Sequence, residues 1–140
     1  MTKFLSKQMQ LIYEEHKTKR YSVYHLYWTG QGQGWTPNSP AYGYIGVSNL
    51  SLEGIKLRYN QEYVEYLNGD RPTRKLYTVL TRLSGFKTIG FDILKGDLTK
   101  RAAYDIEAFY RPERYNYADQ RIWNSIPGGD NSNTTATNRR

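Results

Sequence analysis

Two short segments decide the fold class: residues 21–28 (YSVYHLYW) and residues 42–48 (YGYIGVS). Both are rich in β-branched and aromatic residues, so each predicts a β-strand. Residues 29–40 (TGQGQGWTPNSP) join them, and their closely spaced glycines lack the helix start and Lys-Ser/Thr pair of a phosphate-binding loop. We therefore expect two antiparallel strands joined by a long hairpin connection, of a length typical of functional or mobile loops.

Two helices are predicted after the second strand. Ser51 is a suitable N-cap for the first, and Asn68-Gly69 supplies its stop. Its apolar stripe consists of Ile55, Tyr59, Tyr63, Tyr66 and Leu67. The second helix, over residues 73–83, ends at Gly85 and carries an apolar face of Leu76, Val79, Leu80 and Leu83.

A third strand and a last helix complete the pattern. Residues 88–94 alternate Ile89, Phe91 and Ile93 with polar positions, as a strand does. Asp97 or Thr99 then caps a helix that must end before Pro112. Residues 3–15 have one apolar face, which predicts an N-terminal helix. We expect an α+β fold, a small three-stranded antiparallel sheet flanked by helices, in the order α, β, β, α, α, β, α.

Length and composition limit the domain organisation and the partners. The 140 residues suffice for one hydrophobic core, which we place at residues 21–129, between an N-terminal helical extension (1–20) and a polar flexible tail (130–140). The formal net charge of +7 indicates a polyanionic partner, most commonly nucleic acid. No run of about 18 apolar residues and no signal peptide are present. We therefore expect no membrane partner and a cytoplasmic protein, which includes the cytoplasm of a phage-infected host cell.

The side-chain inventory narrows the chemistry. The chain has no cysteine, which excludes disulfides, thiolate metal sites and cysteine nucleophiles. It has two histidines, so a histidine-rich metal site is not expected, and a divalent ion would bind to oxygen ligands. Mg²⁺ is the natural candidate for such an ion.

A carboxylate lies within the apolar face of the last predicted helix. At 100° per residue, Ala103, Ile106, Glu107 and Tyr110 fall within one narrow sector. An ionised acid that is buried without a partner costs several kcal/mol. Glu107 should therefore bind a metal or lie at the floor of a cleft, or else form an ion pair with Arg58 or Arg111.

The two strands resemble the paired motifs after which the GIY-YIG nucleases are named. The first reads Ser22-Val23-Tyr24, which keeps the tyrosine but not the glycine, and the second is intact as Tyr44-Ile45-Gly46. Residues in the family's order follow: Arg58, Glu107, Arg111-Pro112, Trp123-Asn124 and Gly128-Gly129. The resemblance spans residues 21–129, and the closing string is similar to that of phage and mobile-element members.

This resemblance implies a metal-dependent DNA endonuclease that hydrolyses phosphodiester bonds, with Mg²⁺ or Mn²⁺ as cofactor and one active site per chain. Glu107 would bind the cation, and Arg58 would pair with the phosphate. Tyr24 would accept the proton of the attacking water, as a phenolate favoured by Arg58 and the metal, while Tyr44 hydrogen-bonds in the same pocket. Gly46 supports this site as part of the motif. Asn124, with Asn116 as the alternative, would tie a loop to the wall of the site.

The chain departs from the family at one position. Many members carry a histidine four residues after the helix arginine, where this chain has Glu62. Glu62 could orient Arg58, form a surface ion pair with it, or mark an altered general base. His25 is not a ready substitute, because it directly follows Tyr24 and so points to the opposite face of the strand.

The predicted partner is DNA, contacted by Arg58, Lys56, Arg111 and Trp35, with Arg139 and Arg140 as further candidates in the tail. Cleavage of both strands would require a homodimer, sequential nicks or two copies on one site. Two alternatives remain open: a nucleic-acid-binding module of the same fold that has lost cleavage, and an RNA-directed nuclease, because phosphate contacts alone do not distinguish the sugars.

Overall fold

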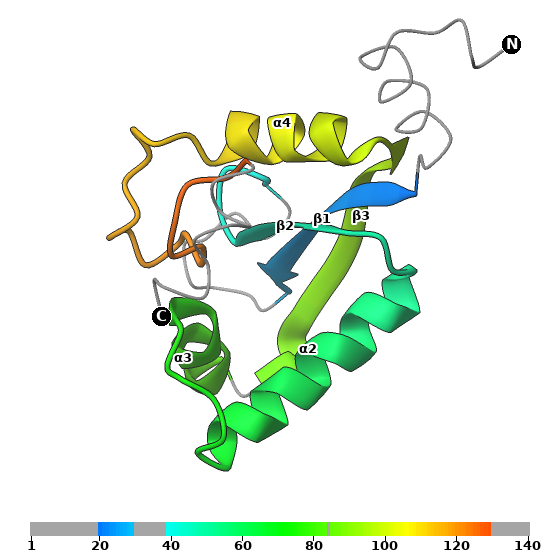
Figure 1. Cartoon of the computed structure of the whole chain (residues 1–140). Helices are drawn as coiled ribbons and strands as arrows, with labels where there is room; N and C mark the ends of the chain where they lie inside the picture. The colour runs from blue at the N-terminus through cyan, green and yellow to red at the C-terminus, as the bar shows by residue number, and fades with distance from the viewer. Residues whose placement is uncertain (1–19, 30–38, 84, 130–140) are drawn as a thin grey trace, which may run out of the picture.

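The structure, a computed structural model, describes residues 20–29, 39–83 and 85–129 (Figure 1). The predicted N-terminal helix, Trp35 and the polar tail lie outside these residues, and so do Arg139 and Arg140. None of the helices in the described ranges combines the length and the apolar character needed to cross a bilayer.

Three antiparallel strands form one sheet in the order β2-β1-β3, as the sequence predicted. In chain order the elements are β1 (Tyr21–Trp28), β2 (Tyr44–Ser48), α2 (Leu52–Leu67), α3 (Lys75–Arg82), the 3-10 helix η2 (Gly85–Thr88), β3 (Ile89–Leu98) and α4 (Lys100–Tyr110). The fold is therefore α+β, with β1 in the centre of the sheet and β2 at one edge.

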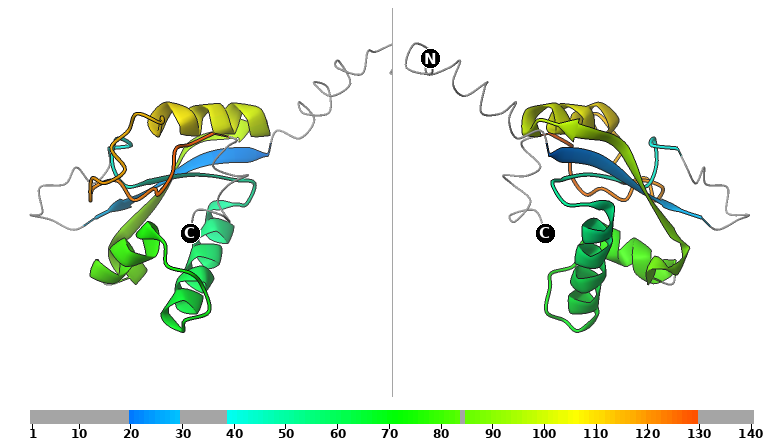
Figure 2. Two further views of the ribbon diagram at one scale, coloured as in Figure 1. Left: turned by 60° about the vertical axis from the view of Figure 1, so that its left-hand side comes forward. Right: turned by 90° about the vertical axis from the view of Figure 1, so that its right-hand side faces the viewer.

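The sheet separates two apolar clusters (Figures 1 and 2). Because side chains alternate along β1, Val23 lies on the face covered by α4, where it packs with Ile45 and Ala103. Tyr24 and Leu26 lie on the opposite face, which α2 and α3 cover. This second cluster is the larger one and contains Ile55, Tyr59, Leu76, Tyr77, Val79, Leu80, Ile89 and Trp123.

Local signals account for most of the boundaries. The Ser51 hydroxyl accepts the Gly54 amide at 3.1 Å and begins α2, and Gly69 adopts φ 82° after its end. Thr99 caps α4 by accepting the Ala102 amide at 3.1 Å. Asp97, the other predicted cap, instead adopts a positive φ of 54° before the helix.

Other boundaries differ from the prediction. β2 begins at Tyr44 rather than at residue 42, because Gly43 pairs in parallel with Ile122 from the far end of the chain. α3 spans Lys75–Arg82 rather than residues 73–83. β3 continues past residue 94 to Leu98, where it still pairs with β1. Two residues predicted for apolar faces, Leu67 and Ile93, are exposed at 57% and 40%.

Candidate active site

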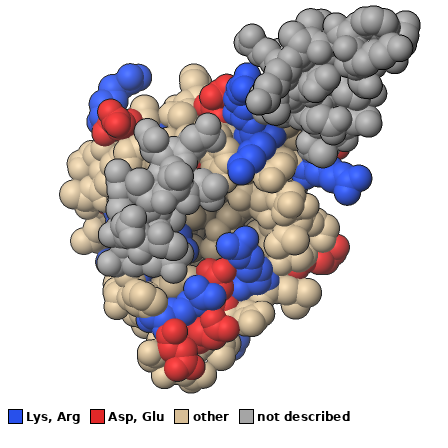
Figure 3. Space-filling model, in the orientation of Figure 1, with Lys and Arg blue, Asp and Glu red and all other residues tan. Residues whose placement is uncertain are grey.

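A cleft of about 310 Å³ lies beside the edge strand β2. Seven of the predicted site residues line it: Tyr24, Tyr44, Gly46, Arg58, Glu62, Glu107 and Asn124. α2 and α4 cover opposite faces of the sheet, yet side chains of both reach the cleft. This is possible at an edge strand, because no further strand separates the two faces of the sheet there and side chains from both faces can come together past the edge. Acidic and basic side chains lie next to each other over α2 and α3 (Figure 3).

Three tyrosines form one side of the cleft. The Tyr24 and Tyr59 hydroxyls share a short hydrogen bond, and their rings meet edge to face with centroids 5.9 Å apart. The Tyr44 ring lies 6.3 Å from that of Tyr24 and 6.1 Å from that of Tyr59. Gly46, opposite Tyr24 in the sheet, makes room for this arrangement, since a Cβ there would lie 2.3 Å from the Tyr24 hydroxyl oxygen.

Burial keeps Tyr24 protonated. Loss of solvent around the ring raises the pKa of Tyr24 well above its usual value of 10.0, and the neighbouring Tyr44 raises it further. The hydrogen bond from Tyr59 and the charge of Arg58 lower this pKa but do not reverse the shift. Arg58 therefore acts in the expected direction, but its charge alone does not offset desolvation, and a phenolate favoured by Arg58 together with a metal stays a prediction.

Glu62 orients Arg58. The Arg58 Nε donates to Glu62 Oε2 at 2.9 Å, and the Tyr77 hydroxyl donates to Glu62 Oε1 at 2.7 Å. Glu62 is buried, with 8% exposed, whereas the Arg58 side chain is 61% exposed. Burial raises the pKa of Glu62, but the hydrogen bonds from Tyr77 and Arg58 outweigh it and the net shift is downward. Of the three roles considered for Glu62, the geometry matches orientation of Arg58 and not a surface pair.

Glu107 lies in the wall of the cleft with 6% of its surface exposed. Its Oε1 accepts the Gly129 amide at 2.9 Å. Gly128 packs so closely that a Cβ there would lie 2.5 Å from the Glu107 carbonyl oxygen. The pair Gly128-Gly129 therefore holds the carboxylate in place. Mg²⁺ usually keeps several waters and binds through one or two carboxylates plus substrate phosphates, so this donor set fits such an ion.

Asn124 fastens the closing segment to the edge of β2. Its Oδ1 accepts the Ile45 amide at 3.0 Å, and its Nδ2 donates to the Ile45 carbonyl at 2.9 Å. Next to it, the Trp123 amide donates to the Gly43 carbonyl at 2.9 Å. The Asn124 side chain thus continues the pairing as a strand would, which is the tie that we expected of it. Asn116, the alternative, is exposed and accepts the Ala118 amide within its own turn.

Arg111 does not face a ligand. It is fully buried, and its guanidinium donates five hydrogen bonds, which is its whole capacity. Asn124 Oδ1 accepts one of them at 3.0 Å, and main-chain carbonyls of Pro40, Tyr42, Gly43 and Tyr110 accept the others at 2.8–3.0 Å. The prediction that Arg111 contacts DNA is therefore wrong, because the side chain is buried and all of its N–H groups already donate to acceptors within the protein.

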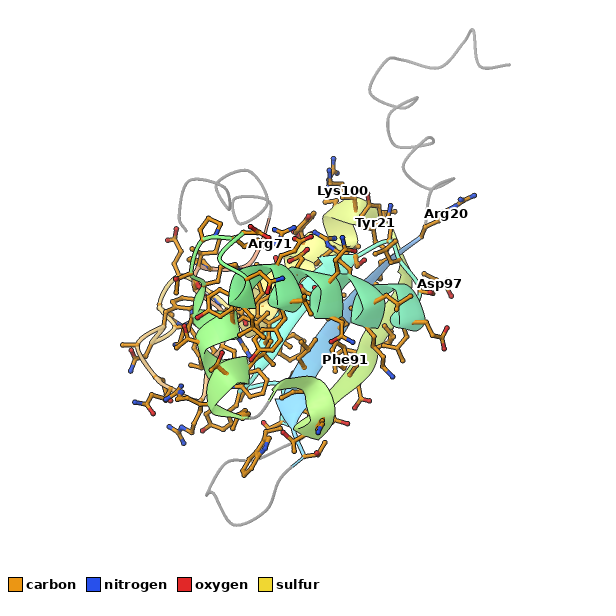
Figure 4. The ribbon with its side chains drawn as sticks, turned by 90° about the horizontal axis from the view of Figure 1, so that it is seen from below. Arg20, Tyr21, Arg71, Phe91, Asp97 and Lys100 are labelled. Atoms are coloured by element: carbon orange, nitrogen blue, oxygen red, sulfur yellow. The ribbon has the colours of Figure 1, made fainter. Side chains whose placement is uncertain are left out.

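His25 and Lys56 lie away from the cleft. His25 is buried on the face opposite Tyr24, and its Nε2 donates to the Tyr42 carbonyl at 2.8 Å. This agrees with its exclusion as a substitute base. Lys56 is exposed on α2, with Nζ 5.8 Å from the ring centroid of Phe91, which lies on β3 beside α2 (Figure 4). A role of Lys56 in binding DNA stays a prediction.

The lining residues that the sequence reasoning did not assign to the site include Tyr59, Arg74 and Tyr104. Tyr59 and Tyr104 follow the apolar periodicity of their helices, so the pattern assigns them to the core. Arg74 lies in the basic run Arg71–Lys75 before α3, and a run of this kind is usually a solvated surface. That run was the one signal available for it.

Comparisons of the chain with family models, with curated proteins and with solved structures found no match. Function is therefore inferred from the residues that the cleft brings together and from the chemistry that they can perform.

Proposed function

We propose that this protein is a metal-dependent DNA endonuclease, similar to the GIY-YIG nucleases, with one active site per chain. One observation carries the proposal: Tyr24, Tyr44, Arg58 and Glu107, which the family resemblance selects from distant parts of the sequence, line a single cleft. Packing of the core alone does not require these four side chains to line the same cleft. The Tyr24 side chain lies on one face of the sheet, whereas α4, which carries Glu107, covers the other face, and each side chain could have been buried separately.

Phosphodiester hydrolysis requires stabilisation of the charge that accumulates on the phosphoryl oxygens. Arg58 suits this task because Glu62 binds only its Nε. In the described part of the chain, both Nη groups of Arg58 are left for phosphate oxygens, and a guanidinium can bind two such oxygens at once. Glu62 thus limits the rotation of Arg58 without blocking its outer edge.

Glu107 would hold the divalent cation, with the remaining positions taken by waters and phosphate oxygens. A bound Mg²⁺ or Mn²⁺ would supply Lewis-acid stabilisation of the scissile phosphate and of the leaving oxygen. The hydrogen bond from the Gly129 amide fixes the direction of the carboxylate before any ligand arrives. Such preorganisation avoids a reorganisation cost during the reaction.

Tyr24 and Tyr44 would orient the attacking water by hydrogen bonds. The Tyr24 hydroxyl forms a hydrogen bond with the Tyr59 hydroxyl, and the Tyr44 hydroxyl accepts a hydrogen bond from Arg74 Nη2 at 3.1 Å. Both oxygens therefore have fixed positions. Because burial keeps Tyr24 a phenol, Tyr24 would accept the water's proton only after the charge of Arg58 and a bound cation had favoured loss of its own proton.

That raised pKa favours a second candidate, a nucleic-acid-binding module that retains the cleft but does not cleave. Glu62 in place of the family's histidine points the same way. Both candidates predict binding to duplex DNA, and only the first predicts cleavage.

The proposal is tested with supercoiled plasmid, with and without Mg²⁺. We expect nicking with the metal, none in EDTA, and a loss of at least about 100-fold in Glu107→Gln. Glutamine keeps an oxygen for the Gly129 amide, so its melting temperature should stay close to that of the parent. Asp105→Asn, an exposed position on the same helix, is the matched control and should nick normally.

Nicking in full chelation, or a parental rate in Glu107→Gln, would contradict the active site proposed here. Binding of DNA without nicking at any Mg²⁺ or Mn²⁺ concentration would favour the binding module. A parallel assay on matched RNA duplexes distinguishes an RNA-directed enzyme.

A further inference from the structure

Arg74 is a second arginine of the cleft and belongs to none of the motifs that suggested the function. It lies directly before α3, and its guanidinium carbon lies 5.8 Å from the ring centroid of Tyr44 and 5.3 Å from that of Tyr77. Its Nη2 donates to the Tyr44 hydroxyl at 3.1 Å. Two aromatic rings therefore fix the direction of this cation at the wall of the cleft.

The charge of Arg74 is not balanced by a carboxylate. Arg58 pairs with Glu62 at 2.9 Å, Arg71 with Glu65 at 2.6 Å, and Arg121 with Asp119 at 2.9 Å. For Arg74, no Asp or Glu of the described ranges lies within ion-pair distance, and its guanidinium lies against the rings of Tyr44 and Tyr77 instead. A half-buried cation among aromatic rings gains more from an anion than a solvated one does.

The start of α3 adds donors beside this cation. Arg74 is the N-cap of α3 and makes no side-chain capping hydrogen bond, while Thr73, Arg74 and Lys75 all line the cleft. Amides of a helix's first turn have no partner within the helix and bind anions well. The Lys75 ammonium contributes less, because it donates to the carbonyls of Tyr117 and Asp119.

One residue connects the two arginines. The Tyr77 ring lies against Arg74, and the Tyr77 hydroxyl donates to the carboxylate that holds Arg58. The two guanidinium groups are thus held on one framework, from α2 and from the start of α3, around the same cleft. Two fixed cations suit a polymer with regularly spaced phosphates.

We infer that Arg74 and the first turn of α3 form a second phosphate subsite, which binds a backbone phosphate of the DNA strand next to the one assigned to Arg58. The inference rests on the proposed function for the identity of the substrate. It adds that the cleft recognises at least two phosphates of one strand, so that a small diester with one phosphate cannot use the subsite.

The test measures binding of a short DNA duplex in EDTA, where no cleavage occurs, over a range of salt concentrations. Each phosphate contact contributes roughly 0.9 to the slope of log affinity against log salt. We expect Arg74→Met to lower this slope by about one contact. Arg71→Met is the matched control: Arg71 follows α2 outside the cleft lining, and Glu65 balances its charge, so the slope should stay at the parental value (Figure 4).

An unchanged slope in Arg74→Met, or an equal fall in Arg71→Met, would overturn the subsite. A second readout uses the parent protein and so does not depend on a variant that folds. Phenylglyoxal modification, mapped by mass spectrometry, should be slowed by duplex DNA at Arg58 and Arg74 but not at Arg71. Equal modification of Arg74 with and without DNA would also overturn it.

Cleavage data separate this inference from the proposed function. If the parent nicks plasmid, Arg74→Met should raise the KM for DNA by a larger factor than the KM for bis(p-nitrophenyl) phosphate, which has one phosphate. Loss of the hydrogen bond from Arg74 to Tyr44 should lower kcat for both substrates alike, whereas Arg58→Met should lower kcat/KM for both substrates by similar factors. A parent that binds DNA with the expected slope change but does not nick keeps the subsite and loses the nuclease. A parent that does not bind DNA overturns both.

Discussion

Arg58 and Arg111 both belong to the pattern that resembles the nuclease family, but one is exposed at the cleft and the other is buried and structural. Arg111 is fully buried and donates five hydrogen bonds, four of them to main-chain carbonyls. The Arg58 side chain is 61% exposed, and within the described ranges only its Nε donates a hydrogen bond, to Glu62. The first region holds the chain together and the second leaves donors for a ligand.

Asn124 joins the two regions. Its Oδ1 accepts from Arg111 Nε and from the Ile45 amide, both at 3.0 Å, and the residue also lines the cleft. The Arg111 region therefore fixes the edge strand on which the cleft depends. From this contrast we expect a division of effects: changes near Arg111 reduce stability, and changes near Arg58 reduce activity in a folded protein.

The largest effect on stability is expected for Arg111→Met. The change removes the Arg111 donor of the Pro40 carbonyl and takes one of two donors from the carbonyls of Tyr42 and Gly43 and from Asn124 Oδ1, at a cost of about 3–5 kcal/mol in the free energy of unfolding. Arg58→Met should cost no more than about 1–2 kcal/mol, because the Arg58 side chain is mostly exposed and the buried Glu62 keeps its hydrogen bond from Tyr77. Urea unfolding of both variants measures this difference.

Nicking activity, measured in folded protein, should fall more in Arg58→Met than in Arg111→Met. Arg58→Met should lose about 100-fold or more in nicking while it remains folded. Equal losses of stability in the two variants would break the comparison, since an exposed arginine would then matter to the fold as much as a buried one.

The sequence could predict the elements because their signals are local. The β-branched and aromatic residues of the strands, the caps Ser51 and Thr99, and the stop at Gly69 are signals that depend on nearby residues, and the three strands, both caps and the stop are confirmed. The start of β2 at Tyr44 rather than at residue 42 could not be predicted in this way. Gly43 leaves β2 to pair with Ile122, a partner 79 residues later in the chain, and no local rule contains that contact.

The sequence could predict which residues belong to the site, but not which of the charged side chains are buried. A family resemblance gathers Tyr24, Arg58 and Glu107 by order along the chain, and the cleft does contain them. It says nothing of which charges are buried. Arginine is mostly exposed in proteins, but acceptors on Asn124 and on the main chain of residues 40, 42 and 43, far from Arg111 in the sequence, make its burial possible.

A smaller effect is expected for Gly46→Ala, within the cleft region. The added methyl would lie 2.3 Å from the Tyr24 hydroxyl oxygen, so the ring must move, at a cost of about 1–3 kcal/mol. Nicking should fall with it, because the tyrosine cluster loses its geometry. Gly96→Ala in β3 is the control: its nearest neighbour would be 3.9 Å away, and stability should change by less than about 0.5 kcal/mol. Parental nicking in Gly46→Ala would show that the position of Tyr24 does not matter for cleavage.

The smallest effect is expected from His25, the titratable group of the Arg111 region. Its Nε2 donates to the Tyr42 carbonyl, which also accepts from Arg111 Nη2 at 3.0 Å. Burial lowers the pKa of His25 below 6.5, and the charge of Arg111 lowers it further against the opposing effects of Tyr42 and Asp92. The unfolded chain therefore binds this proton more readily than the folded protein does, so the contribution of His25 to stability is complete above the unfolded pKa of about 6.5 and falls as the pH drops below it.

Thermal melts between about pH 7.5 and pH 5 should show this fall in the parent and a weaker one in His25→Gln, which cannot titrate. His16 is present in both proteins and does not affect their difference. The same loss of melting temperature in both would mean that another group carries the acid sensitivity, and that the buried region is not weakened through His25.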